Sequence, residues 1–305
     1  MWNLCWEICL RPVVCFNGFR REKSPGTNNV SGELTRQVRG ARGGVYRYNP
    51  ATGGLTPFCW LMKSYIQIAI RTKAETIDWG VGEKLIDSLG VSGGVLLPEQ
   101  VSHNAAKFTE TVLGKGSCES FWASTASIRT NGTLSDFYQD FAWRRKKSIK
   151  SSGSVVHTSR NFRGQIVPGS ICLTAAHSKK VDWYALFRTW CEIFPPQLGM
   201  LHLFTSPELS PSEKHGSFQI GSFNSALRPD VPNVGWGMFY GDEFAQEVDV
   251  PAITAAGFSV EKLVGGYLVR VTDNIQGVVD DFLSFSKRRA ELKDLFRENF
   301  FLIKN

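Results

Sequence analysis

Hydrophobic and polar positions are most regular between residues 234 and 272. From Val234 to Tyr240, large side chains alternate with smaller ones at a period of two, which predicts a strand. Asp242 and Glu243 follow at the start of a helical run, where unpaired amide groups favour negative charge. Extended segments return at 258–271, so this stretch predicts a strand–helix–strand unit with Pro251 near the end of its helix.

Two earlier stretches repeat the change from period two to helical spacing. Residues 64–72 alternate like a half-buried strand and 75–89 like an amphipathic helix, and 167–176 followed by 180–194 does the same. Such openings fit either a pseudo-duplicated fold or one sheet with helices on one side. We predict an α+β fold of two small α/β lobes sharing one interface, with a mainly antiparallel sheet and helices packed on one side.

The remaining pattern is less regular. It predicts a short helix at 105–113, strands at 120–129, 200–204 and 218–223, and a terminal helix within 278–296. The outer side of that terminal helix carries basic residues, namely Lys287, Arg288, Arg289 and Lys293.

Composition changes at residue 62, and this change sets the predicted domain limits. Residues 1–61 hold eight Lys or Arg against three Glu and no sustained periodicity, whereas Met62 opens directly into the first predicted strand. We expect 1–61 to be a poorly ordered leader that precedes the true start at Met62; a genuine, mostly disordered arm is the alternative. The predicted lobes are 62–163 and 164–305.

Charge and cysteine content restrict the partners. The formal charge of +7 would suggest nucleic acid, but most of it belongs to 1–61. Seven cysteines without consistent spacing form neither a disulfide framework nor a zinc motif, so we expect reduced thiols, a cytoplasmic address, and no cofactor or metal. Nothing approaches the length of a transmembrane helix and nothing resembles a secretory signal, so no membrane partner is predicted.

Catalytic motifs are absent from the sequence as far as spacing can show. Phosphate-binding loops, nucleophile elbows and zinc-protease helices are all missing, and the five histidines are scattered. A metal-dependent nuclease or hydrolase could be assembled from Asp230, Glu291 and Lys293. Glu291 and Lys293, however, would lie about 200° apart around a helix. We therefore predict that the chain is not an enzyme.

A basic run at Arg144–Lys147 follows an aromatic stretch at 137–143. Aromatic residues beside cations, together with the basic leader, could bind single-stranded nucleic acid, which is the main alternative function, ahead of the hydrolase. Four consecutive charges before serine and glycine are more typical of a solvated hairpin or an inter-domain loop, so we favour that interpretation.

Short aromatic motifs carry a resemblance to a known family. The motifs are Leu186-Phe187-x2-Trp190, Gly235–Phe239, Asp242-Glu243-Phe244, Gly266–Val269 and Leu295–Arg297. Through them the stretch from about 164 to 305 resembles bacterial toxin-immunity proteins of the immunity protein 52 type, encoded beside polymorphic or type VI secretion effectors with restriction-endonuclease-like toxin domains. The resemblance implies a non-catalytic cytoplasmic inhibitor that neutralises a cognate secreted toxin by protein–protein contact.

A nuclease toxin presents cations to phosphate, so clustered carboxylates would steer an inhibitor to it. Trp236, Phe239 or Tyr240 would supply a buried anchor, unless these aromatic residues belong to the core. The acidic candidates for partner binding are Asp230, Asp242, Glu243, Glu247, Asp249 and Glu261.

Overall fold

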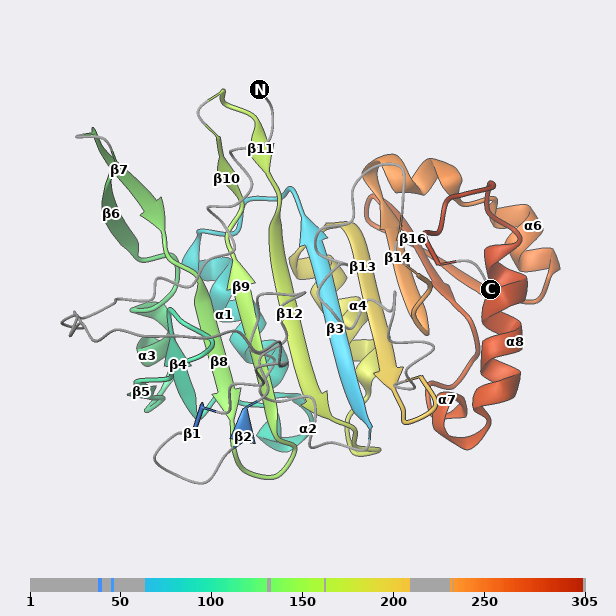
Figure 1. The fold of residues 1–305 in the computed structure, drawn as a ribbon, viewed down its shortest axis with the longest axis horizontal. Coiled ribbons are helices and arrows are strands. Elements are labelled where there is room, and N and C mark those ends of the chain that lie inside the picture. The colour runs from blue at the N-terminus through green and yellow to red at the C-terminus, as the bar shows by residue number, and fades with distance from the viewer. Residues whose placement is uncertain are drawn as a thin grey trace, which may run out of the picture. The chain divides into compact units, whose positions relative to one another are not determined.

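The computed structural model describes residues 64–130, 133–161, 163–208, 231 and 233–303, and two short strands nearer the N-terminus (Figure 1). Those strands, β1 (Val38–Arg39) and β2 (Val45–Tyr46), pair antiparallel within the first of two compact units, Met1–Pro57. The second unit is Phe58–Asn305. The rest of the predicted leader, and the strand predicted at 218–223, lie outside the described residues.

One ten-stranded antiparallel sheet organises the second unit, in the order β15–β16–β14–β13–β3–β12–β9–β8–β4–β5. Two further two-stranded ribbons, β6–β7 and β10–β11, are separate from it and extend past its end in Figure 1. The strands of the large sheet are β3 (Tyr65–Thr72), β4 (Gln100–Ser102), β5 (Glu110–Thr111), β8 (Phe141–Arg145), β9 (Ser151–Val156), β12 (Gly169–Ala176), β13 (Pro196–Phe204), β14 (Gly237–Gly241), β15 (Ser259–Leu263) and β16 (Gly266–Arg270). The ribbons are β6 (Thr125–Thr130) with β7 (Thr133–Tyr138), and β10 (Ser159–Arg160) with β11 (Ile166–Val167).

The first strand of this unit, β3, lies in the middle of the sheet. It pairs with β12 on one side and β13 on the other, and Ile68 faces Leu173 and Leu201 across the two ladders. Alternation along β12 buries Ile171, Leu173 and Ala175, while the residues between them are only half-buried. The period-two pattern therefore builds one apolar sheet face, and the strands predicted at 64–72 and 167–176 are confirmed.

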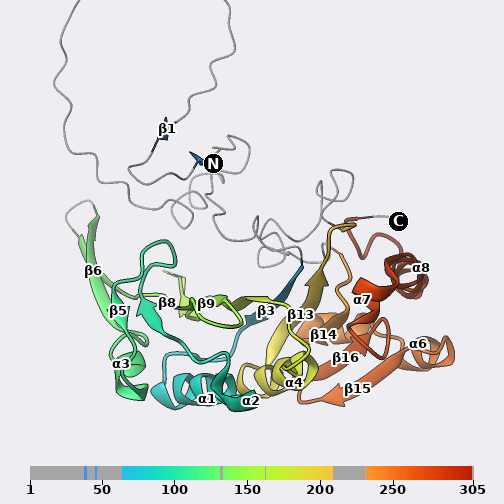
Figure 2. The same ribbon diagram turned by 90° about the horizontal axis from the view of Figure 1, so that it is seen from below.

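Helices cover that apolar face. In Figure 2, α1 (Trp79–Leu89), α2 (Val91–Gly94) and α4 (Trp183–Ile193) lie along one face of the sheet, and α7 (Gly277–Asp280) and α8 (Phe282–Lys293) lie beyond the opposite face near β13 and β14. The side chains of Asp78 and Asp182 cap α1 and α4, so these helices begin a few residues later than predicted. The other helices are α3 (Lys115–Glu119), the 3₁₀ helix η5 (Asp242–Glu247) and α6 (Val250–Ala255). None of the described helices combines the length and apolar character that crossing a bilayer requires.

The α+β class with a mainly antiparallel sheet is confirmed. The strands of the two predicted lobes, 62–163 and 164–305, lie in the same sheet: β12 and β13 of the second flank β3 of the first. Their shared interface is therefore made of backbone hydrogen bonds as well as side chains.

Several local predictions were wrong for identifiable reasons. Residues 105–113 form no helix but lead into the edge strand β5, and residues 120–124 belong to the turn after α3 instead of β6. Pro251 lies in the first turn of α6 instead of ending a helix, because proline fits that turn, where its missing N–H costs nothing. By contrast, the hairpin predicted at 144–147 is confirmed, because the run ends β8 and begins the connection to its antiparallel neighbour β9.

Candidate functional site

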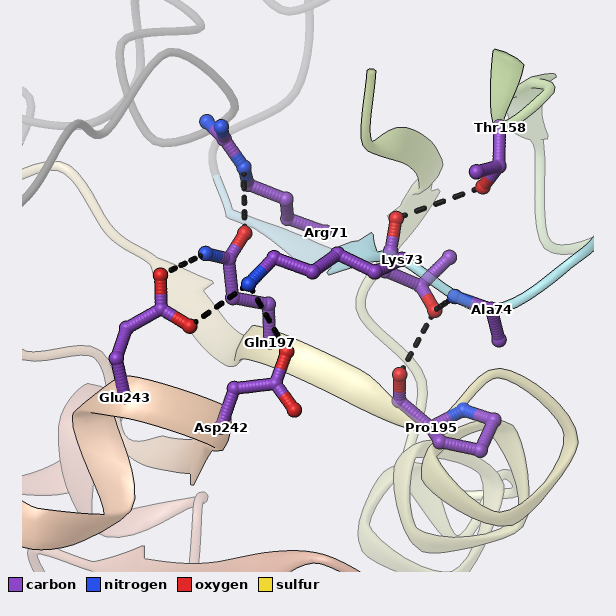
Figure 3. A network of polar contacts seen from close by, with 9 residues as sticks. Arg71, Lys73, Ala74, Thr158, Pro195, Gln197, Asp242 and Glu243 are labelled. Carbon is purple, nitrogen blue, oxygen red and sulfur yellow. Dashed lines mark hydrogen bonds and ion pairs between the residues drawn. The ribbon is translucent and has the colours of Figure 1, made fainter. Parts of the chain in front are cut away.

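Two of the predicted carboxylates meet a lysine where the interior strands β3 and β14 end (Figure 3). Lys73 Nζ lies 2.9 Å from Glu243 Oε2 and 3.4 Å from Asp242 Oδ2. Both β3 and β14 are antiparallel to β13, which lies between them, so they run in the same direction and their C-terminal ends lie on the same side of the sheet. Lys73 follows β3 and the two acids follow β14, and the sheet topology brings them together.

Gln197 of β13 links this pair to a second cation. Its Nε2 donates to Glu243 Oε1 at 2.5 Å, and its Oε1 accepts from Arg71 Nε at 2.9 Å. Burial lowers the pKa of Arg71, and the charge of Glu243 opposes that effect. Because arginine only donates, its contact fixes the orientation of the Gln197 amide, which then presents its N–H to Glu243.

Asp242 is the accessible carboxylate of this network. Its side chain is 48% exposed, against 13% for Glu243. Its φ of +44° places it in the left-handed region that non-glycine residues rarely adopt, at the sharp change of direction from β14 into η5. The chain therefore holds an aspartate in an uncommon conformation at the surface.

The other predicted acids go to separate partners. Glu247 pairs with Arg297 Nε at 2.9 Å, and Asp249 caps α6 by accepting from the Ala252 N–H at 3.0 Å while staying exposed. Glu261 of β15 accepts from Tyr184 Oη at 2.5 Å and Arg188 Nε at 2.8 Å. Asp230 lies outside the described residues. The structure thus brings Asp242 and Glu243 together and disperses the rest.

The predicted aromatic anchors are core residues, which corrects the expectation that they meet a partner. Trp236 and Phe239 are each 1% exposed, and Tyr240 is fully buried. All five residues of β14 are buried, because helices lie on both sides of the sheet there. Trp236 Nε1 donates to Thr272 Oγ1 at 2.9 Å, and burial raises the pKa of Tyr240.

A buried charged cluster was missed by the sequence reasoning. The Trp236 N–H donates to His202 Nδ1 at 3.0 Å, so Nε2 carries the proton and donates to Glu208, which also accepts from Arg289. Burial alone would raise the pKa of Glu208, but His202 and Arg289 outweigh it and hold the pKa at about 2. Arg289 was assigned to the outer side of the terminal helix, and no local motif marks Glu208.

The basic run is occupied by contacts within the chain. Arg144 Nε donates to Gln100 Oε1 at 2.8 Å, and Arg145 and Lys147 each lie 3.7 Å from Glu99 Oε1. The Lys146 N–H is the main cause that lowers the pKa of Glu99, helped by both cations although partial burial opposes it. No observation here favours nucleic-acid binding over a structural role.

The residues of the metal-dependent alternative do not converge. Glu291 pairs with Arg288 at 2.6 Å, whereas Lys293 donates to the Ile303 carbonyl at 3.0 Å. Within the described part of the chain, no group of three or more His, Cys, Asp or Glu side chains could hold a metal ion.

No protein-family model matches the chain, and a search of curated proteins finds no significant match.

Proposed function

We propose that this chain is an immunity protein that binds and neutralises a cognate secreted bacterial toxin, of the nuclease type associated with type VI secretion, in the cytoplasm. The observation that carries the proposal is the exposed carboxylate of Asp242, held beside Lys73 at the start of η5, and a second exposed carboxylate, Asp249, follows at the start of α6. They belong to a segment, 233–303, with eleven Asp or Glu against seven Lys or Arg. Such a surface is complementary to the cations with which a nuclease binds phosphate.

Both carboxylates are held before any partner arrives. Asp242 lies 3.4 Å from Lys73, and Asp249 is fixed by the Ala252 N–H. A side chain that is already ordered loses less conformational entropy on binding than a free one, which favours tight association.

The test is co-expression of the full chain with the toxin candidate encoded beside it, with growth rescue and co-purification as readouts. Asp242→Asn together with Asp249→Asn removes two charges without disfavouring the local backbone conformations, because asparagine tolerates the left-handed region and caps helices as well as aspartate. We expect the double variant to weaken the complex at least about tenfold, mostly through faster dissociation. The affinity that remains should also depend less on salt concentration.

The matched control is Asp78→Asn together with Asp182→Asn. Like Asp249, these exposed aspartates cap helices, α1 and α4, so the pair removes the same charge and alters helix caps away from η5 and α6. We expect it to leave rescue intact. Equal weakening by both pairs would show that η5 and α6 are not the contact surface, and no rescue with no complex for the unmodified chain would refute the immunity function.

A further inference from the structure

A serine, a histidine and a backbone carbonyl are joined by two successive contacts at the base of the β6–β7 ribbon. Ser124 Oγ is 3.2 Å from His103 Nε2, and His103 Nδ1 is 3.2 Å from the Asp140 carbonyl oxygen. His103 follows β4, Ser124 precedes β6 and Asp140 precedes β8, so three separate segments supply the contacts. The His103 and Ser124 side chains are half-buried, which leaves them accessible to a small molecule.

The Asp140 carbonyl determines which ring nitrogen of His103 carries the proton. A carbonyl only accepts, so Nδ1 must donate to it, and in the neutral ring Nε2 is then an acceptor for the Ser124 hydroxyl, whose other acceptor is Gln139 Oε1 at 3.1 Å. The Phe121 ring packs against the imidazole with 4.7 Å between ring centres and restricts its orientation further. This is the arrangement in which a histidine can take a proton from serine.

Ser124 shares one face of the ribbon with exposed apolar side chains. The register that pairs Thr125 with Tyr138 continues to Ser124 and Gln139, whose N–H donates to the Ser124 carbonyl at 2.8 Å. Period-two alternation then places Ile128 and Phe137 on the face of Ser124, and these are 52% and 48% exposed. An apolar strip therefore extends away from the hydroxyl.

The backbone before the serine is also unusual. Ala123 has a φ of +49°, in the left-handed region, where a non-glycine residue is uncommon. Neither the Ala123 nor the Ser124 N–H donates to an acceptor within the described part of the chain, so both are available to a negatively charged oxygen.

We propose that Ser124 and His103 form a nucleophile–base dyad that hydrolyses esters of apolar carboxylic acids. Ser124 Oγ bonds to the ester carbonyl carbon while His103 Nε2 takes the hydroxyl proton; the ester C–O bond breaks and the alkoxide leaves with that proton as an alcohol. Water then attacks the acyl-serine, His103 takes its proton and returns it to Ser124 Oγ, and the carboxylic acid is released. The net reaction is ester plus water to acid plus alcohol.

This activity goes beyond toxin binding and uses a different part of the sheet. The dyad lies beside β4 and β8, whereas η5 follows β14, and four strands, β13, β3, β12 and β9, lie between β14 and β8 in the sheet. Its test needs no toxin, so failure of one proposal is distinguishable from failure of the other.

The experiment treats the purified full chain with a fluorophosphonate probe, locates the adduct by peptide mass spectrometry, and follows hydrolysis of p-nitrophenyl butyrate. We expect the adduct on Ser124 and no labelling or turnover in Ser124→Ala. His103→Gln should slow labelling by about 10²-fold or more, the usual contribution of a general base. Phe137→Thr removes part of the apolar strip, so it should reduce kcat/KM for p-nitrophenyl octanoate more than for p-nitrophenyl acetate.

Ser127 supplies a control three residues along the same ribbon. Its hydroxyl donates to Asp136 Oδ1 at 2.5 Å and has no histidine partner among its contacts. We expect no adduct on Ser127 in the unmodified chain, and this comparison does not depend on whether any variant folds. In Ser127→Ala we expect Ser124 to be labelled in full. Absence of any adduct on Ser124, or an unchanged labelling rate in a His103→Gln protein with an unchanged melting temperature, would overturn the proposal.

Discussion

Glu208 connects the end of β13 to α8 through a charge that water does not reach. It is 2% exposed and accepts from both His202 and Arg289, which hold its pKa at about 2. Because this pKa is lower in the folded than in the unfolded chain, the carboxylate stabilises the fold above pH about 4.3. That contribution, on the order of 3 kcal/mol, should be lost as pH falls through about 2.

Urea unfolding at pH 5 and pH 3 measures this loss as a lower free energy of unfolding at pH 3. Glu208→Gln should reduce the free energy of unfolding at pH 7 by about 3–5 kcal/mol, because it leaves Arg289 buried without its charge partner. The same variant should lose most of its acid sensitivity in this range. Glu119→Gln, at an exposed position in α3, is the control and should behave like the unmodified chain; equal loss in both would contradict the role of Glu208.

Gly153 marks a close approach between β9, β8 and β12. A Cβ atom there would lie 2.2 Å from Trp143 Cζ2 and 2.5 Å from the Cys172 carbonyl oxygen, and neither a buried ring nor a strand backbone can move away. Gly153→Ala should therefore lower the free energy of unfolding by about 1–3 kcal/mol in chemical denaturation. Gly116→Ala in α3 meets nothing within 4 Å and should raise it, by up to about 1 kcal/mol, since alanine favours helix.

At the level of elements, the sequence predicted best where local signals agree. The strands at 64–72 and 167–176 and the helices that follow were predictable because alternation and three–four spacing are local signals, although the caps Asp78 and Asp182, which set where the helices begin, were not recognised. The segment 105–113 lacked such agreement, and it became β5 because Gln100 and Val101 of β4 were available to pair with it. Tertiary pairing decided that segment.

The candidate site was predictable only in part, for the same reason. Asp242 and Glu243 could be placed together at the start of a helical turn from their neighbours in sequence. Their partner Lys73 is 170 residues from Glu243, and only the strand order brings it close. The packing of β14 between helices, which buries Trp236, is likewise a property of the whole sheet, so a pattern of alternating aromatic residues could not distinguish core from contact surface.

The β6–β7 ribbon should be tolerant of substitutions that the large sheet is not. Ile128 is 52% exposed on the ribbon, whereas Ile171 of β12 is fully buried. Ile128→Ala should change the free energy of unfolding by less than about 0.5 kcal/mol, and Ile171→Ala should lower it by about 2–5 kcal/mol. Urea titrations of both variants test this; a large loss for Ile128→Ala would mean that the ribbon packs against the rest of the chain.

For the whole molecule, the central position of β3 makes the two halves of the sheet interdependent. Expressed alone, 164–305 would lack the strand between β12 and β13, and 62–163 would leave β3 without either neighbour. We expect each fragment to show no cooperative thermal unfolding by circular dichroism, and co-expression of both to restore a soluble complex. A cooperative transition in either fragment alone would show that its lobe folds independently.

This strand order also imposes a delay during synthesis. Ile66, Ile68 and Ile70 of β3 are synthesised well before both partner strands, since β12 ends at Ala176, 104 residues after Thr72, and β13 ends at Phe204, 132 residues after it. At a translation rate of about 5–20 residues per second, this isoleucine-rich strand has neither ladder to join for roughly 5–21 s and lacks β13 for roughly 7–26 s. The nascent chain therefore presents an aggregation-prone segment for many seconds, and its yield in the cell should depend on the chaperones that bind such segments at the ribosome exit.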